Sequence, residues 1–131
     1  MQVKKLWQWL LDPPDDAPSV VSGYYTLSAT SVALEDFPEE FGRKLPRYPF
    51  VPATLLGRLA RDERFPGSGK FLLIDALQRA WRQSGQIAAA AVVVEAKDDR
   101  ARKFYESFGF LSLRSHVNRL FLPMQTIEKL L

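Results

Sequence analysis

The sequence contains no cysteine among its 131 residues and only one histidine, His116. The absence of cysteine excludes disulfides, thiolate metal sites and a cysteine nucleophile, and it suits a protein of the reducing cytoplasm. The single histidine lies in a predicted turn near the end of the chain, so there is no obvious histidine base. We therefore predict no metal site, and chemistry that needs no thiolate.

Long hydrophobic runs are also missing. The apolar stretch near the N-terminus, MQVKKLWQWLLDPPDD, is too short to span a membrane and lacks a small-residue cleavage site. The net charge of +3 is a small excess that a solvated basic surface explains, so it does not by itself indicate a polyanionic partner. The length fits one domain over residues 1–131, with residues 1–22 as an atypical N-terminal segment.

The first half of the chain predicts a helix, a strand and a long loop. Val3 to Leu11 has an apolar helical side, which the prolines of DPPDDAP end. The β-branched and aromatic residues of SVVSGYYTLSATSVAL, residues 19–34, predict a strand. The proline-rich and charged stretch from Glu35 to Pro52 predicts a loop with one short helix around Pro38 to Lys44.

A β-α-β unit follows this loop. Thr54 to Arg61 is strand-like, Phe71 to Ser84 has the apolar spacing of a helix that Gly85 caps, and Ile87 to Ala96 is continuously apolar, as a strand covered on both faces is. Two strands in this arrangement lie parallel with a right-handed crossover. The loop RFPGSGK, residues 64–70, then follows the carboxyl end of a parallel strand at a helix N-terminus, where ligands bind in α/β folds.

The last part of the chain predicts a second helix and a final pair of strands. The helix begins at Asp98 or Asp99 as N-cap, presents an apolar stripe that includes Tyr105, and ends at Phe108 before Gly109 in the left-handed conformation. After it we expect a strand over residues 110–113, a turn over 115–118, the strand RLFLPM and a terminal helix over 124–131. The order of elements predicts a mixed α/β fold.

The loop RFPGSGK has two readings. A P-loop requires G-x-x-x-x-G-K-[ST], but Arg64 occupies the position of the first glycine and Phe71 that of the magnesium-binding hydroxyl. The departure disfavours an ATPase or GTPase. The second reading takes R-x-x-G-x-G, Arg64 to Gly69, as a loop whose backbone amides bind a pyrophosphate at the start of a helix.

Three segments together resemble the GNAT family of acetyl-CoA-dependent N-acetyltransferases. They are LLGRLARDERFPGSGK (55–70), the apolar strand ending VVVEAKDD (92–99), and ARKFYESFGF (101–110), which matches the family's A-x-x-[FL]-Y-x-x-x-G-F. Two more segments, GYYTLSATSVAL (23–34) and RLFLPM (119–124), resemble the toxin branch of the family from bacterial toxin–antitoxin pairs. Members of that branch acetylate the free amine of aminoacyl-tRNA and pair with ribbon-helix-helix antitoxins, so the resemblance implies this activity and these partners.

The resemblance also implies site residues. Acetyl-CoA would lie between the two predicted parallel strands, its pantetheine arm bonded by backbone groups and its pyrophosphate held by the loop; the implied cofactor-binding residues are Leu59, Ala60, Arg61, Arg64, Gly67, Ser68, Gly69, Lys70 and Asp98. Asp98 replaces an asparagine common in the family, and its other reading is a helix cap. Tyr105 would act as general acid toward the departing CoA thiolate, although outside the family match it reads as a core residue.

We predict that the acceptor is an α-amine, because a substantial fraction of an α-amine is neutral near pH 7 and it therefore needs little help from a base. A lysine amine is not neutral at this pH. Glu63 or a water chain is the alternative base. The basic side chains Arg43, Lys44 and Arg47 are equally explained as contacts to tRNA phosphates or as a solvated loop.

Two departures from the family pattern keep other functions open. Only Lys70 and Phe71 separate Gly69 from Leu72, where family members usually have four residues, and a loop shorter by two residues presents fewer amides to acetyl-CoA. Only 22 residues precede the segment matching Gly23, so the acceptor wall is either absent or supplied by a second copy in a homodimer. The alternatives are a degenerate, non-catalytic GNAT-fold binding protein, and a GNAT that acetylates a small amine or a protein N-terminus.

Overall fold

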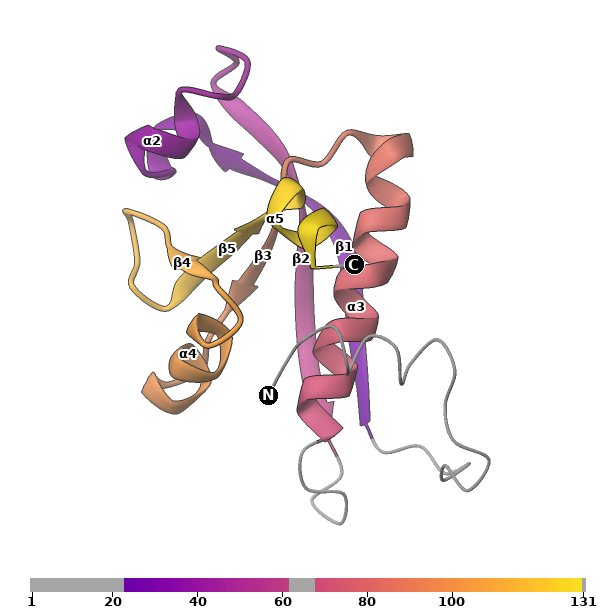
Figure 1. The fold of residues 1–131 in the computed structure, drawn as a ribbon. Coiled ribbons are helices and arrows are strands. Elements are labelled where there is room, and N and C mark those ends of the chain that lie inside the picture. Colours follow the sequence, from indigo (N-terminus) through magenta and orange to yellow (C-terminus); the bar gives the residue numbers. More distant parts are fainter. Residues whose placement is uncertain (1–22, 62–67, 131) are drawn as a thin grey trace.

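The computed structural model describes residues 23–61 and 68–130, which form one five-stranded mixed sheet in the order β1-β2-β3-β5-β4 with helices packed around it (Figure 1). The predicted mixed α/β class is confirmed. The predicted helix from Val3 to Leu11 lies outside the described residues. No helix in the described part of the chain is long and apolar enough to cross a membrane.

Two long antiparallel strands form one side of the sheet. β1 (Gly23–Ala33) pairs with β2 (Phe50–Arg61) along its whole length, from Gly23↔Arg61 to Ala33↔Phe50. The connection between them contains a short 3-10 helix, η1 (Leu34–Asp36), and the predicted short helix, α2 (Glu39–Gly42). β2 begins at Phe50, four residues before the predicted Thr54. The reason is that Val51 and Ala53 are buried and pack as sheet residues beneath this connection.

The predicted β-α-β unit is present. α3 (Ser68–Ile87) joins β2 to β3 (Ala91–Glu95), and the two strands are parallel, with Thr54 opposite Val92. Four consecutive residues of β3, Ala91 to Val94, are buried, which confirms a strand covered on both faces.

The bounds of this unit differ from the prediction. The helix begins three residues earlier, and Gly85 lies inside it rather than at its end. The left-handed residue that follows the helix is Ala88, with φ of 52°, so Ile87 belongs to the helix and not to the next strand. A glycine inside a helix is tolerated where tertiary packing on the opposite face holds the helix, as Leu77 and Ala80 do here.

The C-terminal elements follow the prediction closely. α4 (Asp99–Glu106) is capped by Asp98 and followed by Gly109 in the left-handed region at φ of 97°. β4 (Leu111–Ser112) and β5 (Arg119–Pro123) form a hairpin, in which β5 lies between β3 and β4. The chain then enters α5 (Met124–Lys129).

Alternating side chains divide the core into two clusters, one on each face of the sheet. One cluster joins Leu56, Val92 and Leu122 to α3, α4 and α5. The other joins Val93 and Phe121 to the connection between β1 and β2. Phe37 meets the Phe121 ring edge-on at 5.0 Å, and such aromatic pairs add about 0.5–1.5 kcal/mol to the stabilisation from burial. The short helices are therefore fastened to the sheet by aromatic packing.

The edge strand β1 is tied to α3 by a polar contact. The Tyr25 hydroxyl donates a hydrogen bond to the Asp75 carboxylate, which also pairs with Arg79 at 3.4 Å. Burial, followed by the hydrogen bond to this carboxylate, raises the pKa of Tyr25 well above its ordinary value. The hydroxyl therefore stays a donor at neutral pH.

Candidate functional site

The two central parallel strands pair over a short distance only. β2 and β3 are paired from Thr54↔Val92 to Leu56↔Val94, and β2 continues to Arg61 without a partner on that side among the described residues. The backbone of this terminal segment is therefore available to an external ligand, since exposed N–H and C=O groups seek partners. The predicted cofactor-binding residues Leu59, Ala60 and Arg61 all lie on it.

A β-bulge lies in the same segment. Tyr24 of β1 pairs with Ala60, whereas Thr26 pairs with Gly57, so Tyr25 faces two residues of β2, Arg58 and Leu59. Bulges bend and twist a strand and are frequent next to active sites. The bulge turns β2 at the point where its pairing with β3 has ended.

Gly57 begins the unpaired segment. A Cβ at this position would lie 2.9 Å from the Thr26 Oγ1 atom, closer than real Cβ contacts. Gly57 therefore permits the close approach of β1 and β2 immediately before the bulge.

The N-terminus of α3 lies beside the end of β2 (Figure 1). Ser68, Gly69 and Lys70 belong to its first turn, where backbone N–H groups lack partners within the helix and attract anions. Arg64 and Gly67, the other loop residues predicted to bind the pyrophosphate, lie outside the described residues. The residues of this loop that are described thus lie at a helix N-terminus, as the sequence predicted.

Tyr105 is buried on α4. It is 8% exposed and belongs to the core cluster that also contains Leu56 and Ala96, and its ring lies 5.4 Å from that of Phe110. Burial raises the pKa of the Tyr105 hydroxyl. A tyrosine in this state carries its proton at neutral pH and can donate it.

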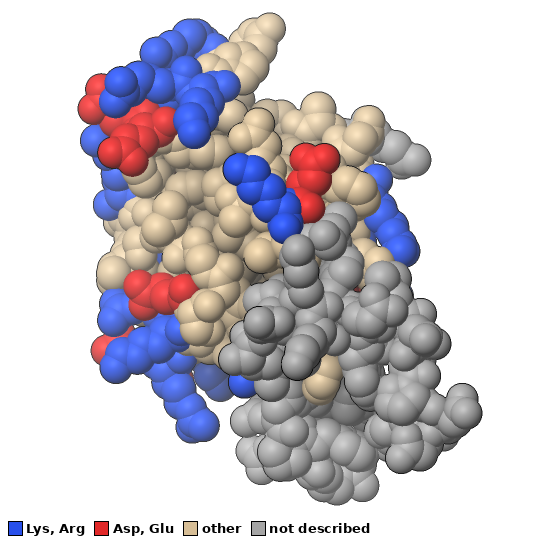
Figure 2. All heavy atoms as spheres, in the orientation of Figure 1, with Lys and Arg blue, Asp and Glu red and all other residues tan. Residues whose placement is uncertain are grey.

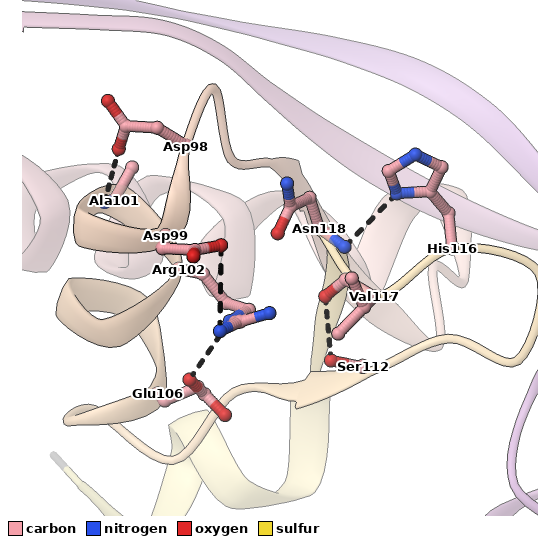
Figure 3. Close-up of polar contacts among 9 residues, drawn as sticks. All are labelled: Asp98, Asp99, Ala101, Arg102, Glu106, Ser112, His116, Val117 and Asn118. Atoms are coloured by element: carbon pink, nitrogen blue, oxygen red, sulfur yellow. Dashed lines mark hydrogen bonds and ion pairs between the residues drawn. The ribbon is translucent and has the colours of Figure 1, made fainter.

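Asp98 closes the N-terminus of α4. Its Oδ1 atom accepts a hydrogen bond of 2.8 Å from the Ala101 backbone N–H (Figure 3). This contact is the capping interaction that was the alternative reading of Asp98. Its predicted role toward acetyl-CoA stays a prediction. The cap uses only Oδ1, so the second carboxylate oxygen is not needed for it.

A cavity that the sequence did not reveal lies between the end of β3 and the turn of the β4–β5 hairpin. It has a volume of about 460 Å³ and is lined by Glu95, Ala96, Ser115, His116, Asn118 and Arg119. Ala96 lines it and also belongs to the core cluster of Tyr105, so the cavity borders that cluster. We call it the hairpin cavity.

Two polar atoms in the wall of the hairpin cavity lack hydrogen bonds. The Asn118 Oδ1 atom is a buried acceptor with no donor, and the buried Arg119 Nε has only the Glu95 carboxylate, at 3.6 Å, too far for a hydrogen bond. Buried polar groups without partners are costly and therefore rare. The residues that carry these two buried atoms, Asn118 and Arg119, also line the cavity.

His116 is oriented by its own turn. Its Nδ1 atom accepts a hydrogen bond of 3.1 Å from the Asn118 backbone N–H (Figure 3). Because Nδ1 is an acceptor, the imidazole proton lies on Nε2 and the ring is a donor toward its surroundings. The prediction that His116 is not the general base stays a prediction.

The hairpin turn is held from the other side by η1. The Asp36 carboxylate accepts hydrogen bonds from the Ser115 backbone N–H and hydroxyl at 2.6 and 2.8 Å, and the Arg114 N–H donates to the Asp36 carbonyl. Residues that are 79 positions apart are thus locked together. The wall of the hairpin cavity is therefore rigidly joined to the connection between β1 and β2.

Parallel strands whose pairing stops beside a bulge, with a helix N-terminus at their open end, are the arrangement expected of the GNAT fold. No protein-family model matches the chain. The chain is 35% identical over 126 residues to the probable toxin TacT of Sinorhizobium fredii, and this match covers 89% of the chain and 69% of TacT. The chain therefore belongs to the family of GNAT-fold toxins that includes TacT.

Other relatives agree with this membership. The chain is 41% identical over 92 residues to a tRNA-acetylating toxin of Mycobacterium tuberculosis, covering 69% of the chain and 54% of the relative. AtaT in complex with acetyl-methionyl-tRNAfMet superposes with a TM-score of 0.76 at 34% identity, over 83% of the chain and 66% of AtaT. A Tyr-to-Phe variant of AtaT bound to the C-terminus of the antitoxin AtaR and acetyl-CoA superposes at 0.67, with 29% identity over 83% of the chain and 64% of AtaT.

The chain thus spans just under two thirds of AtaT and about half of the mycobacterial toxin. The resemblance inferred from residues 23–124 is confirmed at the level of fold and family.

Proposed function

We propose that the protein transfers the acetyl group of acetyl-CoA to the α-amine of aminoacyl-tRNA and acts as the toxin of a toxin–antitoxin pair in the cytoplasm. The observation that carries the proposal is the unpaired, bulged end of β2 beside the N-terminus of α3. This arrangement offers backbone groups to an amide-containing arm and a positive dipole to its phosphates.

Acetyl-CoA fits this end of the sheet. The free backbone of Leu59, Ala60 and Arg61 would bond the pantetheine arm, and an amide near Leu59 would support the oxygen of the thioester. Gly69 and Lys70 in the first turn of α3, with Ser68, Arg64 and Gly67, would hold the pyrophosphate. Acetyl-CoA supplies the activated acyl group, and the chain contributes orientation and charge stabilisation.

Tyr105 would supply the proton that the reaction needs. The acceptor nitrogen forms a bond to the thioester carbonyl carbon, the carbon–sulfur bond breaks, and the thiolate takes the proton of the Tyr105 hydroxyl. The raised pKa keeps the Tyr105 hydroxyl protonated at neutral pH. The proton lost by the amine passes to solvent, and the Tyr105 phenolate takes up a proton from solvent, so the side chain is restored for the next turnover.

The acceptor end agrees with an α-amine. An α-amino group with a pKa of about 7.7–8.0 is roughly 10–17% neutral at pH 7, far more than a lysine amine with a pKa of about 10.4, so no strong base is required. His116 is not available as one, because its Nδ1 is engaged in the hairpin turn. The Glu95 carboxylate would accept a hydrogen bond from the amine in the hairpin cavity, and the buried Asn118 Oδ1 would do so once its side chain turns toward the cavity.

Control by an antitoxin is part of the proposal. AtaT, a structural relative, is bound to the C-terminus of the antitoxin AtaR in the presence of acetyl-CoA. We expect a ribbon-helix-helix antitoxin to bind this chain and arrest its activity. Growth arrest on expression, relieved by a co-expressed neighbouring gene, tests this part separately from the chemistry.

The chemistry is tested with Tyr105→Phe. We expect wild-type protein to bind acetyl-CoA saturably and to acetylate aminoacyl-tRNA, and Tyr105→Phe to lose about 10²–10⁴-fold in kcat while binding acetyl-CoA equally well. The measurements are calorimetric titration with acetyl-CoA and transfer of labelled acetyl to aminoacyl-tRNA.

Two results would contradict the proposal in different ways. Equal rates for both proteins would remove Tyr105 as the acid. No binding at millimolar acetyl-CoA would identify the chain as a non-catalytic binding protein of the same fold.

A further inference from the structure

A second cavity, of about 510 Å³, lies at the far end of the sheet, between the connection of β1 to β2 and the hairpin turn. Its wall contains three arginines, Arg43, Arg47 and Arg114, with the ring of Phe50 and the carboxylates of Glu35 and Glu39. We call it the arginine cavity. Figure 2 shows Lys and Arg side chains gathered over the corner of the molecule that holds α2.

The arginines of this cavity differ from other arginines of the protein. Arg79, Arg102 and Arg119 each lie within 4 Å of a carboxylate. Across residues 23–61 and 68–130, no ion pair or hydrogen bond is formed by the side chains of Arg43, Arg47 or Arg114, although two glutamates share their cavity. Three guanidinium groups are thus free to bind an anion with several oxygens.

Exposed aromatic rings accompany these charges. Phe50 in the wall is 62% exposed and its neighbour Tyr48 is 69% exposed, which makes them two of the four large hydrophobic side chains exposed in the described part of the chain. An aromatic face beside free arginines is the combination on which nucleotides bind, because the bases stack and the guanidinium groups neutralise the phosphates.

The arginine cavity has a fixed position relative to the hairpin cavity. Arg114 lines the first and Ser115 lines the second, and both residues are held by hydrogen bonds to Asp36. Phe37, which also lines the arginine cavity, and Phe41 pack on Phe121 of β5 at 5.0 and 5.1 Å. One molecule can therefore occupy both cavities at once without rearrangement of the fold.

Acetyl-CoA bound at its own site does not reach this cavity. The arginine cavity lies at the Phe50 end of β2, whereas the unpaired backbone lies at the Arg61 end. A strand of 12 residues is roughly 35 to 40 Å long, so the two sites are at opposite ends of the sheet. The nucleotide that fits the arginine cavity must belong to the acceptor.

We propose that the arginine cavity binds the sugar-phosphate backbone of the acceptor RNA, with Arg43, Arg47 and Arg114 on phosphates and the Phe50 ring against a base or sugar. This inference rests on the proposed function and deepens it, because it places the RNA across the hairpin turn while the aminoacyl end lies in the hairpin cavity. Contacts of this kind fix the position of the RNA without reading its sequence.

The test is direct binding of unacylated, fluorescently labelled tRNA, measured by anisotropy over a range of salt concentrations. For the triple variant Arg43→Gln, Arg47→Gln, Arg114→Gln we expect the slope of log Kd against log salt to fall by about 2 to 3, since each phosphate contact contributes about 0.7–0.9. Phe50→Ala should weaken binding about tenfold with an unchanged slope. In the transfer assay the triple variant should raise KM for aminoacyl-tRNA and leave kcat unchanged.

The matched control is the double variant Arg82→Gln, Arg100→Gln, in which each change also removes one positive charge. Both arginines are exposed and lie outside the cavity. The slope of log Kd against log salt should therefore differ from that of wild type by less than the contribution of one phosphate contact, about 0.7–0.9. Acetyl-CoA binding by the triple variant, measured by thermal shift, should also be unchanged, which shows that the variant is folded.

Several outcomes would overturn the inference. These are equal RNA binding by the triple variant and the control, no RNA binding by wild type, or competition of free CoA for the RNA site. By contrast, a chain that binds RNA through these arginines but transfers no acetyl group would refute the proposed function and leave this inference standing.

Discussion

The two ends of the sheet are built by different means. At the Arg61 end of β2, the available groups are backbone atoms, exposed because β2 outruns β3 and carries a bulge. At the Phe50 end, the available groups are side chains, three free arginines and an exposed ring on a connection fastened by aromatic packing. One end offers amides and a helix dipole, and the other offers charge.

This difference indicates how each end responds to mutation. A backbone site is insensitive to most side-chain changes but depends on strand register and on the close approach that glycine allows. A side-chain site tolerates shifts of the backbone but loses one contact with each substitution. The comparison of the two ends is therefore tested by substitutions that change the backbone geometry at one end without changing the charged side chains at the other.

The largest effect expected on acetyl-CoA affinity follows from the Gly57 contact. In Gly57→Ala the new Cβ would meet the Thr26 Oγ1 atom at 2.9 Å, so Thr26 or the strand must move. We expect a loss of about 1 kcal/mol in the free energy of unfolding and an acetyl-CoA affinity lower by up to about tenfold, measured by urea denaturation and calorimetry. RNA binding should be unchanged.

Two variants control this prediction. Adding Thr26→Ala should restore acetyl-CoA affinity, because it removes the obstructing atom. Gly85→Ala, whose Cβ would have no atom within 4 Å, should instead stabilise α3 by up to about 1 kcal/mol. If Gly57→Ala binds acetyl-CoA like wild type, the bulged segment does not carry the cofactor.

A smaller effect is expected at the hairpin cavity. Asn118→Leu removes a buried acceptor without a donor, so the free energy of unfolding should stay equal or rise by about 1 kcal/mol. KM for aminoacyl-tRNA should rise about tenfold if the same oxygen accepts a hydrogen bond from the acceptor. Steady-state kinetics and urea denaturation measure the two effects.

Thr54→Val is the matched control for this change. The Thr54 Oγ1 atom is also buried without a partner, but Thr54 does not line the hairpin cavity. It should share the gain in stability and leave the kinetics unchanged. An equal KM for Asn118→Leu and wild type would exclude the hairpin cavity as the acceptor site.

The smallest effect concerns Asp98. Asp98→Ala should lower the free energy of unfolding by about 1 kcal/mol through loss of the cap to Ala101, whereas Asp98→Asn should change it by only a few tenths. If Asp98 only caps α4, acetyl-CoA affinity will fall only in a variant whose free energy of unfolding also falls. A loss of affinity in Asp98→Asn without a loss of stability would show a direct role at the cofactor.

Much of the fold and part of the site could be predicted from local patterns. The apolar run Ala91–Val94 predicted a doubly covered strand, Asp98 and Gly109 predicted the two ends of α4, and the motif around Tyr105 predicted the family. The bounds of α3 were wrong because Gly85 lies in the helix interior, where packing of the opposite face overrides the preference of glycine for helix ends.

The sequence by itself determined the strands, the glycine that follows α4 and the buried position of Tyr105. The reason is that periodicity, turn preference and apolar runs are properties of neighbouring residues. Only the tertiary structure decided where β2 loses its pairing with β3, that Asp36 and Ser115 lock two distant segments together, and that the Asn118 Oδ1 atom is buried without a donor. These features depend on the register of strands and on contacts between residues far apart along the chain, which local patterns do not encode.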